Sequence, residues 1–179
     1  MTDARLFEAF VRRYQDMVFA TAVRMLGSHA DAEDVAQTVF LRAFQRFARI
    51  GSSPAAAGWL KAVTRNECLN HLSRYRARWR FFSELSDARS DDPVPALADA
   101  RAGSFRSALD DAARHRALEE AIRQLPEHQR VPLVLFHFEE LSYQEIADTL
   151  HVSLGKVKTD IHRAREALRT VLSADDATR

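Results

Sequence analysis

The sequence predicts an all-α protein built from two small helical domains. Hydrophobic residues make up 46% of the chain and charged residues 28%, which is typical of a globular protein rather than a disordered one. Five glycines and five prolines are few for a β-rich protein, whereas the abundant Ala, Leu, Arg and Glu favour helix. A length of 179 residues allows one ordinary domain or two small ones. Each small domain can bury only a modest core, which favours docking on a larger partner.

The first two helices are expected over residues 5–26 and from Ser28 onward. Apolar residues recur at helical spacing in the first, and Gly27 follows it as a natural C-cap. Acidic residues crowd the first turn of the second helix, where the helix dipole favours them. Its apolar stripe is predicted to comprise Val35, Phe40, Phe44 and Phe47. Its polar face, either simply solvated or in contact with a partner, comprises Asp31, Glu33, Asp34, Gln37 and Thr38.

A third helix is predicted from about Ala55 towards Arg78, because Ser53-Pro54 is a good helix start. Between Arg42 and Arg80 the sequence has nine basic residues and one acid. Basic patches on helices are typical of nucleic-acid binding, and Asn and Arg are residues that reach base edges and phosphates. A solvated basic face is the alternative. The candidates for such contacts are Asn66, Asn70, Arg74, Arg76 and Arg78.

An acidic flexible linker is expected to divide the chain into the two domains. Helical periodicity fades from about Ser83, and residues 81–111 contain seven acids and three arginines together with several turn-forming residues. We therefore expect the first domain at 1–80, the linker at 81–111 and the second domain at 112–174.

The second domain is predicted to end in a helix-turn-helix. Two helices are expected first, one from near Ala112 to the stop at Pro126 and one over residues 127–139. The segment Ser142-Tyr143-Gln144-Glu145 is then a capping box that starts a short helix. A tight turn at 151–153 leads from it to a longer helix.

The two faces of that longer helix are expected to make different contacts. One face is apolar, with Val157, Ile161, Ala164, Leu168 and Val171, and should pack inward. The free face is basic and suited to the major groove; an ordinary αα-hairpin is the alternative. The free face carries Lys156, Lys158, Thr159, His162, Arg163 and Arg165.

Several function classes lack the residues that they need. The single cysteine, Cys68, excludes an internal disulfide and a thiolate metal cluster, and the seven histidines show no ligand spacing. No Gly-rich phosphate loop or nucleophile elbow occurs, so we expect neither an enzyme nor a cofactor or metal site. Acidic and basic residues interrupt any signal-like or membrane-spanning apolar run. We therefore expect a cytoplasmic protein.

Two segments resemble a known family. The run FEAFVRRYQDMVFATAVRMLGSHADAEDVAQTVFLRAF, followed by GWLKAVTRNECLNHLSRYRAR, resembles region 2 of the extracytoplasmic-function (ECF) sigma factors, a compact branch of the sigma-70 family. The run ALEEAIRQLPEHQRVPLVLFHFEELSYQEIADTLHVSLGKVKTDIHRAREALRTVL resembles their region 4. The resemblance implies an RNA polymerase sigma factor that binds core polymerase and directs promoter-specific initiation.

The resemblance also implies roles for particular residues. The helix carrying DAEDVAQTVFLRAF is similar to the surface that docks on core polymerase, which makes Asp31, Asp34, Gln37 and Phe40 polymerase-binding candidates. The loop around residues 50–58 and the third helix are similar to the elements that melt and read the −10 element, with Asn66 and Asn70 against unpaired bases. The last helix is similar to the −35 reader, with contacts expected from Lys156, Lys158, Thr159, His162 and Arg163.

Two positions depart from the family pattern. Lys156 follows Gly155 where the family commonly has Thr, and we expect it to add a phosphate contact. Asp160 stands where a basic residue is frequent. An acid there would be repelled by phosphates unless it accepts a hydrogen bond from a cytosine amino group.

Two other functions remain open on the residues alone. One is a conventional helix-turn-helix regulator that recruits polymerase without replacing its sigma factor, and the other is a structural interaction protein. The family resemblance implies three partners, namely core RNA polymerase, promoter DNA and an anti-sigma factor.

Overall fold

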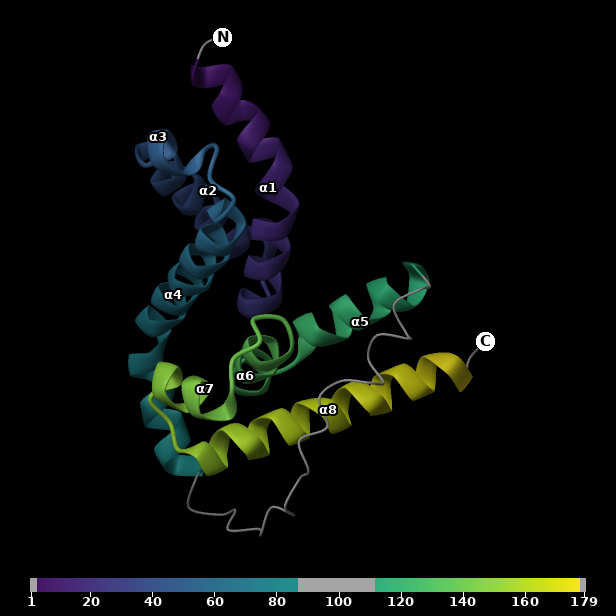
Figure 1. Cartoon of the computed structure of the whole chain (residues 1–179). Helices are drawn as coiled ribbons and strands as arrows, with labels where there is room; N and C mark the ends of the chain where they lie inside the picture. The colour runs from purple at the N-terminus through teal and green to yellow at the C-terminus, as the bar shows by residue number, and fades with distance from the viewer. Residues whose placement is uncertain (1–2, 87–111, 178–179) are drawn as a thin grey trace. The chain divides into compact units, whose positions relative to one another are not determined.

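The computed structural model describes residues 3–86 and 112–177, and the side chains within them at 4–73 and 115–172. It divides into two units, Met1–Ser90 and Asp91–Arg179 (Figure 1). The described residues form eight helices and no strand, as the sequence predicts. None of these helices is long and apolar enough to cross a membrane.

The first unit is a bundle of α1 (Asp3–Leu26), α2 (His29–Gln45) and α4 (Ala56–Ser86), with the short α3 (Phe47–Ile50) after α2. Gly27 ends α1 in the left-handed region, with φ 71°, and the Ser28 hydroxyl accepts a hydrogen bond from Asp31 N at 3.3 Å at the start of α2. The three long helices pack on one another around side chains that are fully buried. These include Val18, Met25, Val39, Leu60 and Cys68.

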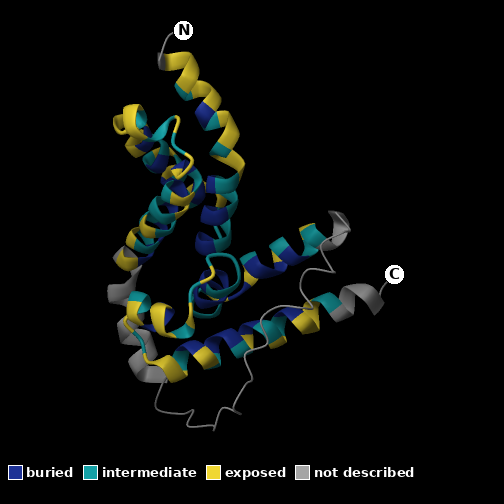
Figure 2. Cartoon of the chain, viewed as in Figure 1, coloured by how far each residue is buried: buried dark blue, intermediate teal, exposed yellow. Residues whose placement is uncertain are grey.

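The second unit is built around α8 (Leu154–Ala177), which α5 (Ala112–Gln124), α6 (Glu127–His137) and α7 (Tyr143–Leu150) all contact. Figure 2 shows the buried residues of α8 along the helix length, alternating with exposed ones. The predicted capping box is present, because Ser142 Oγ accepts from Glu145 N at 3.3 Å and Ser142 N donates to Glu145 Oε2 at 2.8 Å. The predicted turn at 151–153 is also confirmed, with His151 in the left-handed region at φ 56°.

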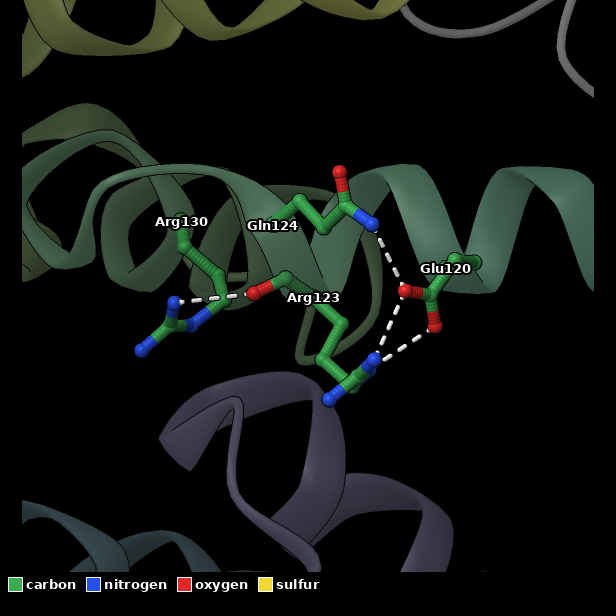
Figure 3. A network of polar contacts seen from close by, with 4 residues as sticks. All are labelled: Glu120, Arg123, Gln124 and Arg130. Atoms are coloured by element: carbon green, nitrogen blue, oxygen red, sulfur yellow. Dashed lines mark hydrogen bonds and ion pairs between the residues drawn. The ribbon is translucent and has the colours of Figure 1, made fainter.

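A buried arginine closes the junction between α5 and α6. The side chain of Arg130 is 7% exposed, and its Nη1 donates to Leu125 O at 2.7 Å and to Arg123 O at 3.3 Å. These carbonyls lie at the C-terminal end of α5, where the helix itself offers no donor. On the outer side, Glu120 accepts from both Arg123 and Gln124 (Figure 3). Arg130 of α6 therefore donates hydrogen bonds to carbonyl groups at the end of α5 that would otherwise lack a partner.

Three helix boundaries differ from the sequence prediction. α4 begins at Ala56 and continues to Ser86, so residues 81–86 of the predicted linker are helical. α2 ends at Gln45, and Phe47 lies in the separate α3, because the chain turns at Arg46. α6 ends at His137 rather than near Glu139. The remaining linker residues, 87–111, lie outside the described part of the chain.

Candidate nucleic-acid interface and an apolar groove

The α8 helix presents four of its five predicted DNA contacts on one accessible face. Lys158 and Arg163 are exposed, and Thr159 and His162 are half-buried. Positions 158 and 162, and 159 and 163, are one helical turn apart, so they lie side by side on the helix surface. On the opposite side, Val157, Ile161, Ala164 and Leu168 are all buried, as predicted, but Val171 of the same predicted face is 53% exposed. Packing thus aims one polar side of α8 outward.

Lys156 and Asp160 are arranged differently from that face. The Asp160 side chain is buried, with 4% of the residue exposed, and its Oδ2 lies 3.3 Å from Lys156 Nζ. Burial raises the pKa of the Asp160 carboxyl, while Lys156, His128 and Arg163 oppose that shift. Both sequence-based expectations for Asp160, phosphate repulsion and contact with cytosine, assume an exposed carboxylate. The structure corrects that assumption.

Arg165 also faces inward, contrary to the prediction that it joins the free basic face. Its Nε donates to His137 Nε2 at 3.3 Å, and its guanidinium lies 5.3 Å from the centre of the Phe136 ring. Phe136 in turn stacks on Tyr143 at 4.6 Å between ring centres. Burial, with a smaller contribution from Arg165, lowers the pKa of His137 to about 4, so the neutral ring can accept this hydrogen bond. Arg165 therefore ties α8 to α6.

The predicted single-strand contacts on α4 are accessible where the structure describes them. Asn66 and Asn70 are both exposed and lie one turn apart. Arg74, Arg76 and Arg78 fall within α4, but their side chains lie outside the described residues. Beneath the asparagines, Leu60 and Cys68 bury the other side of the helix.

The predicted partner-binding residues of α2 do not share one face. Gln37 and Phe40 line a groove of about 640 Å³ between α1 and α2. Asp34 is exposed but does not line this groove. Asp31 Oδ1 instead lies 3.4 Å from His71 Nε2 on α4. Farther along α2, Arg42 Nη1 lies 2.8 Å from Glu67 Oε1, so two polar pairs connect α2 to α4.

Sequence reasoning missed most of this groove. Leu41 is 65% exposed and Phe44 is 58% exposed, although Phe44 was expected in the core stripe. Phe7, Val11 and Phe19 of α1 form the facing wall. The sequence does contain one indication of the groove, which is that the apolar surface of α2 is wider than its core contacts require. Val35, Val39 and Ala43 suffice for the core, and Phe40, Leu41 and Phe44 form a second stripe beside them. An exposed apolar groove is typical of a protein interaction site.

Comparisons with known proteins identify both units. Residues 10–79 match the family described as "Sigma-70 region 2", and residues 115–168 match "Sigma-70, region 4". The chain is 33% identical over 172 residues to an RNA polymerase sigma-H factor of Pseudomonas aeruginosa, an alignment that covers 95% of this chain and 88% of that protein. It is 31% identical over 179 residues to the ECF RNA polymerase sigma factor SigL of Mycobacterium tuberculosis, covering 99% of this chain and 94% of the relative. The ECF RNA polymerase sigma factor SigE of Mycolicibacterium smegmatis is 34% identical over 171 residues, but the chain spans only 62% of its length.

Proposed function

The chain belongs to the ECF branch of the sigma-70 family of RNA polymerase sigma factors, and we propose which of its surfaces contact the promoter and which contacts the polymerase. The helix α8 reads the duplex −35 element, α4 captures unpaired bases of the −10 element, and the groove between α1 and α2 docks on core polymerase. The observation that carries the proposal is the accessible polar face of α8 in a helix-turn-helix.

The chemistry of α8 supports duplex recognition. Lys158 and Arg163 are exposed cations suited to phosphates or guanine edges, and Thr159 and His162 lie between them. The Thr159 hydroxyl donates to Gly155 O at 3.0 Å, which leaves its oxygen able to accept and its methyl group able to contact thymine. Lys156 belongs to this predicted set, but its ammonium is already paired with Asp160.

The residues of α4 support capture of single-stranded DNA. An amide side chain both donates and accepts hydrogen bonds, so Asn66 and Asn70 can pair with the exposed edge of an unstacked base. Arg74, Arg76 and Arg78 extend the same helix with positive charge for the backbone. Each half alone should bind DNA weakly. Held on one polymerase, the second contact becomes intramolecular, which strengthens the pair.

The groove supports docking on the polymerase. A contiguous apolar surface with Gln37, Glu33 and Asp16 at its edges is suited to an amphipathic helical partner. Gln37 and Phe40 make this contact inside the groove, whereas Asp31 and Asp34 lie outside it and are proposed as separate contacts with the polymerase. An anti-sigma factor that covered the same groove would block docking and hold the protein inactive. Catalysis comes from core polymerase, so this chain is not an enzyme and acts in the cytoplasm, where the polymerase works.

Run-off transcription tests the proposal. Purified core polymerase is combined with this chain and a library of genomic fragments from the source bacterium. We expect promoter-specific transcripts that start downstream of a shared pair of upstream boxes. A conventional helix-turn-helix regulator would require an additional sigma factor, so the absence of transcripts from core plus this chain alone would reject the proposal.

Substitutions on α4 test the −10 assignment. Asn66→Ala and Asn70→Ala should each reduce formation of the open promoter complex by about tenfold, since a lost base contact costs about 1–3 kcal/mol. Ser73→Ala is the matched control, because Ser73 is exposed on the same helix, three residues after Asn70. Neutralising Arg74, Arg76 and Arg78 together should also weaken promoter engagement, whereas a structural interaction protein would show no change.

A further inference from the structure

An acidic side chain lies inside the helix that reads DNA. Asp160 is the one acid among the buried polar residues of the described chain, which otherwise comprise Thr21, Thr64 and Arg130. It follows Thr159 directly and lies between Lys156 and Arg163 in sequence. The helix therefore carries a negative charge within one turn of its predicted phosphate contacts.

A buried carboxylate requires a partner, and Lys156 supplies it. An unpaired charge removed from water is costly, whereas an ion pair compensates much of that cost. The Lys156 ammonium lies 3.3 Å from Asp160 Oδ2, and its side chain is only 27% exposed. The other charged or titratable groups that act on this carboxylate are His128 of α6 and Arg163 of α8. Burial lowers the pKa of His128, which favours its neutral form, and Arg163 is exposed on the polar face.

Two neighbouring lysines of α8 are therefore in different situations. Lys158 is exposed and forms no ion pair with the described residues, so it can approach a phosphate freely. For Lys156 to contact a phosphate, it would have to leave Asp160 buried without its closest cation. The energetic penalty on Asp160 offsets what the phosphate contact would contribute.

We propose that Asp160 is a positioning residue that holds Lys156 within the protein and so limits its contact with promoter DNA. The inference rests on the proposed −35 role of α8. Lys158 and Arg163 then provide the phosphate contacts of this helix, and Lys156 acts as the internal counter-ion of Asp160. The residue that departs from the family pattern thereby weakens non-specific attraction to DNA at the start of the recognition helix.

Lysine labelling tests the proposal without DNA. The chain has only three lysines, Lys61, Lys156 and Lys158, so acylation of each is resolved by mass spectrometry. In the free full-length protein, Lys156 should react about twofold to fivefold more slowly than Lys158, the range expected for a partly exposed ion pair. Asp160→Asn should remove that difference, while the exposed Lys61 serves as the internal standard. Equal rates in the wild-type protein would overturn the proposal, even if the variant failed to fold.

Salt dependence tests the consequence for DNA binding. Holoenzyme containing the full-length chain is bound to a promoter fragment recovered by run-off transcription, over a range of salt concentrations. Asp160→Asn should tighten binding and steepen the log–log salt dependence by about 0.9, the value for one additional phosphate contact. Lys156→Gln should change the slope little in the wild-type background and remove that gain in the Asp160→Asn background.

Lys158→Ala is the matched control, and it should lower the slope by about 0.9 in both backgrounds. If Lys156→Gln lowers the slope equally in both backgrounds, Lys156 contacts phosphate despite Asp160, and the proposal is wrong. The same conclusion holds if Asp160→Asn tightens binding regardless of residue 156, because the effect would then be general electrostatics. Failure of the wild-type holoenzyme to recognise any promoter would instead reject the proposed function.

Discussion

The two units expose opposite kinds of surface. The α1–α4 unit leaves large apolar side chains in the open, with Leu41 and Phe44 more than half exposed beside a groove. The α5–α8 unit buries two charged groups, Arg130 and Asp160, and the side of α8 that carries Lys158 and Arg163 is polar, although Leu154 and Val171 are exposed elsewhere on that helix. An apolar groove is suited to another protein, and a polar helix face is suited to DNA. This difference supports assigning polymerase docking to the first unit and duplex recognition to the second.

The largest expected effect comes from placing a charge in the groove. Leu41→Glu should weaken binding to core polymerase roughly hundredfold, about 2.7 kcal/mol, because the carboxylate would have to be desolvated at an apolar contact. Gln45→Glu adds the same charge to α2 at an exposed position outside the groove and should have little effect. Affinity is measured by fluorescence anisotropy with labelled protein. Equal losses in the two variants would remove the basis for assigning the groove to the polymerase.

A somewhat smaller effect is expected from the buried arginine of the second unit. Arg130→Met should destabilise that unit by about 2 kcal/mol, because the carbonyls of Arg123 and Leu125 would lose their donor in a buried place. Both tryptophans, Trp59 and Trp79, lie in the first unit. Tryptophan fluorescence should therefore show an unchanged unfolding transition, while far-UV circular dichroism shows a destabilised one. A shift in the fluorescence transition would show that the units do not unfold independently.

Lowering the pH should destabilise the second unit through His137. The folded-state pKa is about 4, below the ordinary value of 6.5, so the unfolded chain binds the proton more readily. The stability that the neutral ring contributes is fully present above pH 6.5 and is lost as the pH falls towards 4. Allowing for solvent screening of this half-buried ring, the loss should be about 1–2 kcal/mol. Urea unfolding at several pH values measures it.

His137→Gln is the control for this titration, because the amide oxygen can still accept from Arg165 but does not titrate. The variant should show a flatter pH dependence between 6.5 and 4. His128, whose pKa burial also lowers, accounts for part of the remaining slope. An unchanged pH profile would mean that protonation of His137 does not contribute to the pH dependence of the stability of this unit.

The smallest expected effects come from the two helix caps, one in each unit. Ser142→Ala should cost about 1 kcal/mol, because it removes a reciprocal capping box at the start of α7. Ser28→Ala should cost less, since Ser28 makes a single capping hydrogen bond to Asp31 N. Thermal unfolding followed by circular dichroism compares them. The reverse order would show that the caps do not contribute in proportion to their hydrogen bonds.

Features that depend on residues close together in the chain could be predicted from the sequence. The caps at Gly27 and Ser142, the turn at 151–153 and the inward face of α8 as far as Leu168 all follow from hydrogen bonds or periodicity within a few residues. Such local preferences are readable because the interacting groups are adjacent in sequence. The all-α fold and the helix-turn-helix could be predicted for the same reason.

Which polar and apolar groups are exposed depends instead on contacts between helices that are distant in the sequence. Arg165 turns inward because His137, 28 residues away, accepts its hydrogen bond. Phe44 stays exposed because the groove that it lines between α1 and α2 is open to solvent. The carboxylate of Asp160 would favour an exposed position, yet the residue lies three positions after the buried Val157 and four before the buried Ala164. There α6 packs on α8, and Lys156 one turn away compensates the charge of Asp160. Burial depends on neighbours from distant helices, and local periodicity does not contain that information.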